Sequence, residues 1–207
     1  QVKHVYENVP YYKKLMDEKG VTPDDIKSTD DLHKLPFLTK ADLRDAYPYG
    51  LMSAPLSDCV RIQSTSGTTG RRVVAFYTQN DIDLWEDCCA RAIVAAGGTK
   101  DDVCHVSYGY GLFTGALGLH YGLENIGATI IPSSTGNSEK QIMYMKDFGT
   151  TLLVATPSYA LRLAEVAREM GIDPKVDLNV KIGLVGSELL TDAMREEMHK
   201  VWGEDML

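Results

Sequence analysis

Hydroxyl side chains and glycines gather at residues 63–72 (QSTSGTTGRR), and these are residue types that can bind phosphate. Glycine permits positive φ and carries no Cβ, so several backbone N–H groups can converge on one anion. The Ser and Thr hydroxyls add donors at the same place. Because a polyphosphate needs many fixed donors and little steric bulk, this stretch is a candidate phosphate-binding loop.

The P-loop of kinases and GTPases is the first alternative for such a loop, and the spacing excludes it. That motif has four residues between its glycines, followed by Lys-Ser/Thr at the start of a helix. Here two residues separate Gly67 from Gly70, and two arginines follow. Residues 73–77 (VVAFY) are β-branched and aromatic, which predicts a strand. We therefore expect a strand–loop–strand hairpin with a hydroxyl-rich tip; an ordinary surface turn is the alternative.

Short apolar runs alternate with helical patterns through the rest of the chain. They predict strands near 103–107, 128–132, 151–155 and 180–185, and helices near 114–126, 138–148, 158–170 and 192–202. Ser138 and Gln141 have the spacing of a helix-capping pair. This alternation is typical of a largely parallel sheet with helices on both faces. We expect an α/β domain at 59–207, beginning with the hairpin and preceded by a helical segment at 1–58.

Ligands of open α/β sheets bind beyond the carboxyl ends of the strands. Small, hydroxyl and aromatic residues follow each predicted strand, at 108–111 (YGYG), 133–136 (SSTG), 156–158 (TPS) and 186–188 (GSE). The sequence therefore predicts a ligand site along this edge of the sheet.

Residues 109–115 (GYGLFTG) follow a predicted strand and share part of the glycine spacing of a dinucleotide fingerprint. The third glycine stands one place late, and Pro132 and Ser133 stand where an acidic residue would end the next strand. A nicotinamide site is therefore disfavoured.

The same stretch has the composition of a pocket for an aromatic acid. Its rings supply flat apolar walls, and its glycines leave room for a ring beside the backbone. The residues concerned are Tyr108, Tyr110, Phe113, Tyr121, Gly111, Gly115 and Gly118. From the residues alone, a core role for these aromatics between helix and sheet is an equal alternative.

Composition and charge exclude several classes of partner. The chain has 207 residues, of which 44% are hydrophobic and 24% charged, as in a globular protein. Its net charge of −8 disfavours nucleic acid and anionic membranes. The cysteines show no C-x-x-C spacing and the histidines no metal-site spacing, so we expect no metal site and a reducing compartment. Without an apolar stretch long enough for a signal peptide or membrane span, a cytoplasmic location is expected.

The loop STSGTTGRR resembles the phosphate-loop signature of the adenylate-forming enzymes, the acyl-CoA synthetase superfamily. Residues 6–14 (YENVPYYKK), 108–122 (YGYGLFTGALGLHYG), 155–174 and 185–195 resemble the phenylacetate–CoA ligases within it. The resemblance covers nearly the whole chain. It departs where the family usually has Lys-Pro and Pro-Trp, since this chain has Arg71-Arg72 and Leu189-Leu190 there.

The resemblance implies an ATP-dependent aryl-acid–CoA ligase that uses phenylacetate or a related aryl acid, ATP, Mg²⁺ and coenzyme A, with a homodimer as one option for its assembly. It implies no certain catalytic residue and no metal ligand within this chain. The implied phosphate-binding residues are Thr65, Ser66, Gly67, Thr68, Thr69, Gly70 and Arg71. The implied adenine-binding residues are Gly186, Ser187 and Glu188, and the implied aryl-acid residues are Tyr108, Tyr110, Gly111, Phe113, Thr114 and Gly115. For the Glu188 side chain, a role at a helix start is the alternative.

Family members carry further elements beyond the position of Gly203: a motif for Mg²⁺, an aspartate for the ribose, and a small C-terminal domain with a lysine. None is found in this chain. We therefore expect the first part of the large domain of such an enzyme, inactive by itself. The alternative is a stand-alone module that binds nucleotide or a partner without catalysis.

Overall fold

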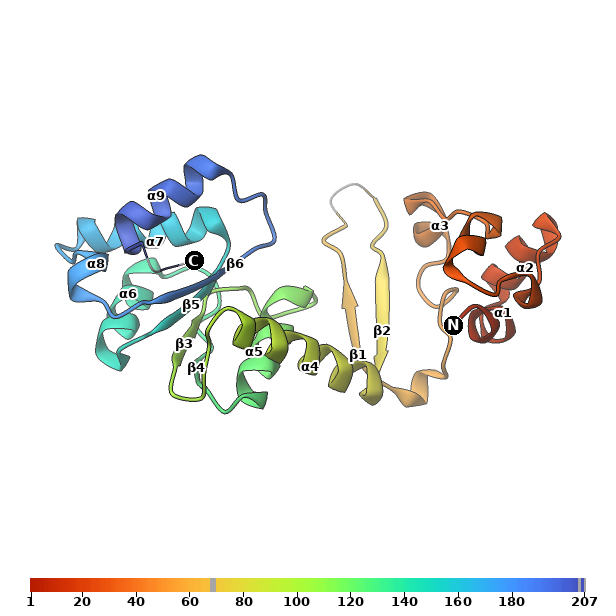
Figure 1. Cartoon of the computed structure of the whole chain (residues 1–207), viewed down its shortest axis with the longest axis horizontal. Helices are drawn as coiled ribbons and strands as arrows, with labels where there is room; N and C mark the ends of the chain where they lie inside the picture. Colours follow the sequence, from red (N-terminus) through yellow and green to blue (C-terminus); the bar gives the residue numbers. More distant parts are fainter. Residues whose placement is uncertain (68–69, 205, 207) are drawn as a thin grey trace. The chain divides into compact units, whose positions relative to one another are not determined.

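The computed structural model of the chain describes residues 1–67, 70–204 and 206. These residues form two compact units, Gln1–Ile82 and Asp83–Leu207 (Figure 1). The boundary between the two units falls inside helix α4 (Gln79–Ala95). The hairpin therefore belongs to the same compact unit as the helical segment that precedes it. The domain boundary after residue 58 stays a prediction.

The first unit consists of short helices followed by one antiparallel hairpin. Its α-helices are α1 (Val2–Asn8), α2 (Pro10–Lys19) and α3 (Lys40–Asp45), with 3₁₀ turns at Pro23–Asp25, Thr29–Lys34 and Leu56–Asp58. Its strands are β1 (Cys59–Ser64) and β2 (Val74–Thr78). The predicted strand–loop–strand hairpin is therefore confirmed, and no helix follows the glycine loop directly.

The second unit is built on a parallel sheet of four strands in the order β4-β3-β5-β6. The strands are β3 (Val103–Val106), β4 (Thr129–Ile131), β5 (Leu152–Ala155) and β6 (Ile182–Val185). The helices are α5 (Thr114–Asn125), α6 (Ser138–Phe148), α7 (Pro157–Glu169), α8 (Pro174–Asp177) and α9 (Asp192–Trp202). All four predicted strands and all four predicted helices are present here, because hydrophobic periodicity marks each of them locally. The short helix α8 was not expected.

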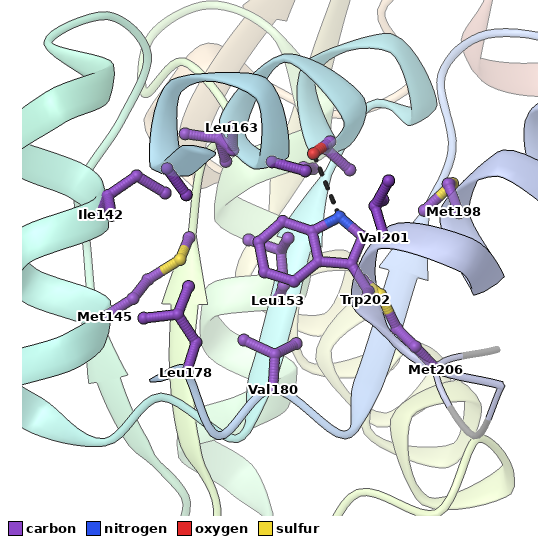
Figure 2. Close-up of a cluster of buried hydrophobic side chains, with 14 of the residues drawn as sticks. Ile142, Met145, Leu153, Leu163, Leu178, Val180, Met198, Val201, Trp202 and Met206 are labelled. Carbon is purple, nitrogen blue, oxygen red and sulfur yellow. Dashed lines mark hydrogen bonds between the residues drawn. The ribbon is translucent and has the colours of Figure 1, made fainter. Parts of the chain in front are cut away.

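Strand β5 shows that helices cover both faces of this sheet, as predicted. Leu153 and Ala155 belong to a cluster with residues of α6, α7 and α9, whereas Leu152 and Val154 belong to a cluster with residues of α4 and α5. Successive side chains of a strand point to opposite faces, so the two clusters lie on opposite sides. In the first cluster the buried indole of Trp202 donates a hydrogen bond of 3.2 Å to the carbonyl of Ala160 (Figure 2).

Two glycines of α5 allow close packing against the part of α4 in the second unit. A Cβ on Gly118 would lie 2.5 Å from the indole of Trp85, and one on Gly122 would lie 2.7 Å from Cβ of Cys89. The expectation that Gly118 leaves room for a substrate ring is therefore wrong, because Trp85 fills that space. Within the described ranges, every helix is too short or too polar to cross a membrane.

Candidate functional site

Two hydrogen bonds join the two ends of the glycine loop, just beyond Ser64 and Val74, the last paired residues of the hairpin. The backbone N–H of Thr65 donates to the carbonyl of Val73 at 3.0 Å, and the N–H of Val73 donates to Oγ1 of Thr65 at 3.1 Å. The Thr65 hydroxyl oxygen therefore braces the loop, and its proton remains the part that can be donated to a ligand. Thr65 and Ser66 are both exposed.

The tip of the loop needs its glycines for conformational reasons. Gly67 has a φ of 72° and Gly70 a φ of 132°, in the region that side chains disfavour. The N–H of Gly70 donates to the carbonyl of Gly67 at 3.2 Å, so these two glycines lie close together. The predicted phosphate-binding residues Thr68 and Thr69 lie outside the described residues. Arg71, the residue after Gly70, is exposed.

In the second unit, Tyr108 ties three strand ends together. It follows β3 and is 9% exposed, and its hydroxyl lies 2.9 Å from the carbonyl oxygens of both Ala155 and Gly186. These carbonyls stand at the end of β5 and just after β6. Burial raises the pKa of the Tyr108 phenol, so it stays a neutral donor. The strand ends therefore meet at one edge, as the sequence predicts.

The predicted adenine and aryl-acid residues approach each other at this edge. A Cβ on Gly115 would lie 3.8 Å from both Oγ of Ser187 and the ring of Tyr108. Gly186 is equally close to the Tyr108 hydroxyl, since a Cβ there would lie 3.8 Å from it. The structure thus brings together Tyr108, Gly115, Gly186 and Ser187 in one small-residue environment.

Other predicted aryl-acid residues lie in a different setting. Gly111 and Thr114 are exposed, and the Phe113 ring is 55% exposed. The Tyr110 hydroxyl lies 3.0 Å from Nδ1 of His120, and the two rings meet edge to face. Burial, with the nearby Glu124 charge, raises the pKa of Tyr110 to about 12. The contact of these residues with an aryl acid stays a prediction.

Glu188, which is predicted to bind adenine, accepts a hydrogen bond from the start of a helix. Its Oε1 accepts a hydrogen bond of 2.6 Å from the backbone N–H of Ser158, in the first turn of α7. Hydrogen bonds from the Ser158 side chain and backbone hold the pKa of the Glu188 carboxyl below its usual value. The side chain therefore caps a helix start, and adenine binding at this position stays a prediction.

A buried polar network behind the strand ends was missed from the sequence. Gln141 of α6 is 1% exposed, and its Oε1 accepts from Nε2 of His105 at 2.9 Å and from Oγ of Ser107 at 2.8 Å. Its Nε2 donates to the carbonyls of Ser134 and Gly136 at 3.1 and 2.7 Å, and to the Tyr159 hydroxyl at 3.0 Å.

This network fixes the backbone that follows β4. The Gln141 amide links the end of β3, the loop 134–136 and α7. Burial lowers the pKa of His105, which keeps the imidazole neutral. The predicted capping pair of Ser138 and Gln141 is wrong, because the Gln141 side chain turns into the core instead. A single glutamine on a helix carries no sequence signal for this role.

Metal ions in proteins prefer carboxylate, imidazole and thiolate ligands. Among the described residues, no group of three or more His, Cys, Asp or Glu side chains could hold a metal ion.

Relatives of known function match the chain from end to end. A phenylacetate-coenzyme A ligase of Pseudomonas putida is 48% identical over 206 residues, which cover 100% of this chain and 47% of the relative. A phenylacetate-coenzyme A ligase of Escherichia coli strain K12 is 48% identical over 203 residues, covering 98% of this chain and 46% of the relative. No protein-family model matches.

Solved structures give the same result for the fold. A 2-hydroxyisobutyryl-CoA ligase in complex with 2-HIB-AMP and CoA matches with a TM-score of 0.91 at 26% identity, covering 98% of this chain and 44% of that protein. The hairpin, the parallel sheet and this match define the fold of the adenylate-forming CoA ligases. Within that class, the chain is a homologue of the phenylacetate–CoA ligases, as the resemblance implied. It spans about half the length of the curated relatives it matches.

Proposed function

We propose that the protein is an AMP-forming aryl-acid–CoA ligase that acts on phenylacetate or a close relative. The observation that carries this proposal is the 48% identity to phenylacetate–CoA ligases across the whole chain. The geometry of the glycine loop supports it, since positive φ at Gly67 and Gly70 lets backbone donors gather at the tip.

The proposed reaction has two steps. A carboxylate oxygen of the acid bonds to the α-phosphorus of ATP and pyrophosphate leaves, giving an acyl-adenylate. The thiol sulfur of coenzyme A then bonds to the acyl carbon, loses its proton, and AMP leaves with the bonding electron pair. Such chemistry depends on positioning and on stabilising charge more than on a protein nucleophile.

The chain's own residues would bind and orient the substrates. Donors of the loop from Thr65 to Gly70, with Arg71, would hold the β- and γ-phosphates. Residues 186–188 would lie against adenine, and the aromatic stretch after β3 would receive the aryl group. Arg71 keeps the positive charge of the usual lysine but presents a planar fork of donors. Mg²⁺ as counter-ion, a cytoplasmic location and a homodimer belong to the same proposal.

The decisive assay is acid-dependent exchange of labelled pyrophosphate into ATP by the protein made from its whole natural reading frame. We expect exchange with phenylacetate and much less with acetate, followed by thioester formation when coenzyme A is added. Binding of ATP without acid-dependent exchange would contradict the proposal and favour a non-catalytic nucleotide-binding module.

The phosphate loop can be tested with two glycines of matched conformation. Gly67 and Gly20 have φ values of 72° and 70°, so alanine would have to adopt a left-handed φ at both positions. We expect Gly67→Ala to raise the KM for ATP by about tenfold or more, because a Cβ there would also lie 2.7 Å from Cγ of Arg72. Gly20→Ala, with nothing within 4 Å of its Cβ, should leave the KM unchanged.

The aryl-acid residues can be tested with two neighbouring exposed side chains. Phe113→Ala should raise the KM for phenylacetate by about tenfold, because a lost ring face removes roughly 1–3 kcal/mol of apolar contact. Leu112→Ala, at 46% exposure, serves as the neighbouring control. An equal loss for ATP and phenylacetate in Phe113→Ala would identify Phe113 as a structural residue.

A further inference from the structure

Helix α3 places a basic residue beside the glycine loop of the same unit. A Cβ on Gly70 would lie 3.9 Å from Cζ and 4.0 Å from Nη1 of Arg44. The guanidinium therefore lies close to the loop backbone at Gly70. Gly70 is exposed, so this place is accessible within the unit to a ligand that the loop would bind.

A second arginine lies beside the other glycine of the loop, Gly67. A Cβ on Gly67 would lie 2.7 Å from Cγ and 3.5 Å from Nε of Arg72. Arg71 is exposed next to it. Among the described residues, neither Arg71 nor Arg72 forms an ion pair. Positive charges gathered at one loop repel each other, and a bound polyanion relieves that repulsion.

Helix α3 is anchored well enough to hold Arg44 in place. Thr39 and Asp42 form a capping box at its start. The Thr39 side chain accepts from the backbone N–H of Asp42, and Oδ2 of Asp42 accepts from the backbone N–H and the hydroxyl of Thr39, both at 2.6 Å. These bonds, with one of 2.8 Å from the Tyr11 hydroxyl, lower the pKa of Asp42 to about 2. Tyr11 belongs to α2, so the helix that carries Arg44 is tied to its neighbour. Arg44 itself is half-buried.

We propose that Arg44 is a further phosphate-binding residue, which holds the polyphosphate of the nucleotide from the side of Gly70 while Arg72 holds it from the side of Gly67. This inference rests on the proposed function, since it assumes a polyphosphate at the loop. Guanidinium suits the task because its parallel N–H donors match two phosphate oxygens at once. In this chain the arginines at positions 44, 71 and 72 then act together on one anion.

The test is the binding of inorganic tripolyphosphate and of ATP to the protein made from its whole natural reading frame, measured by titration calorimetry at two salt concentrations. We expect Arg44→Gln to weaken tripolyphosphate on the order of tenfold or more and to flatten the dependence on salt. Arg44→Lys keeps the charge and should recover only part of the affinity. Lys14→Gln removes a charge of the same unit that pairs with Glu18 on α2, and should leave binding unchanged.

The outcomes separate this inference from the proposed function. Wild-type affinity for tripolyphosphate in Arg44→Gln would overturn the role of Arg44 while leaving the ligase proposal intact. Equal affinity of Arg44→Lys and wild type would overturn the proposed two-oxygen contact. A wild-type chain that binds neither tripolyphosphate nor ATP would overturn both. Far-ultraviolet circular dichroism of each variant shows whether the fold is retained, and Arg44→Lys keeps the test decisive if Arg44→Gln does not fold.

Discussion

The carboxylate of Glu188 lies 2.6 Å from the backbone nitrogen of Ser158 and so connects the loop after β6 to the first turn of α7. The first N–H groups of a helix have no partner within the helix, and the helix dipole adds partial positive charge there. A residue that the family resemblance assigns to adenine binding therefore also stabilises the edge of the sheet. The two roles can be separated by measuring stability and nucleotide binding on the same variant.

Replacement of Glu188 by glutamine should make stability less dependent on pH. The pKa of Glu188 is lowered in the folded state, so its charge contributes stability above the usual carboxyl pKa, and this is lost as pH falls through the folded-state pKa. We expect Glu188→Gln to lose about 0.5 kcal/mol at pH 7, since the side chain is exposed, and less than this at pH 3. Urea unfolding at both pH values measures this, with Glu196→Gln on α9 as control. The same loss at both pH values would show that charge is not involved.

Replacement of Gln141 by leucine should destabilise the second unit and free the loop after β4. The change leaves the buried Nε2 of His105 and hydroxyl of Ser107 without their shared acceptor. An unsatisfied buried polar group costs about 1–3 kcal/mol, so we expect a loss in that range or above. Urea unfolding measures the loss, and hydrogen exchange should rise at residues 133–137. Lys140→Leu, at the exposed neighbouring position, should change neither quantity.

Alanine should destabilise the protein at one glycine of the aromatic stretch and be tolerated at another. Gly118→Ala would place a Cβ 2.5 Å from the Trp85 indole, whereas Gly111→Ala would meet nothing within 4 Å. We expect Gly118→Ala to lose about 1–3 kcal/mol through overpacking, despite the better helix propensity of alanine, and Gly111→Ala to change stability by less than about 0.5 kcal/mol. Thermal and urea unfolding check both values. A neutral Gly118→Ala would mean that α4 and α5 can move apart freely.

Thiol reactivity should distinguish the cysteines of the second unit. Cys104 in β3 is fully buried, and burial, with the nearby Asp102 charge, raises the pKa of its thiol to about 12. Cys88 is exposed on α4. Because the thiolate is the reactive form, a disulfide reagent at pH 8 should modify Cys88 in the native protein and Cys104 only after unfolding. Peptide mapping by mass spectrometry identifies the sites; rapid native labelling of Cys104 would contradict the buried strand.

Local patterns in the sequence determined the order of elements, the hairpin and the parallel sheet. Hydrophobic periodicity and helix-ending glycines act over a few residues, so they can be read without knowing any distant contact. For the same reason, the spacing of Gly67 and Gly70 was enough to exclude a P-loop. The edge of the sheet where a ligand would bind also followed, because parallel strands end together.

Only the tertiary structure decided which side chains meet at those elements. The partner of Gln141 is 36 residues away at His105, and the partner of Glu188 is 30 residues away at Ser158. The space beside Gly118 is filled by Trp85 rather than by a ligand. Arg44 of α3 lies beside Gly70 of the glycine loop. Each of these contacts depends on how separate helices and strands pack, and packing is set by the shape of the whole unit rather than by the period of any one segment.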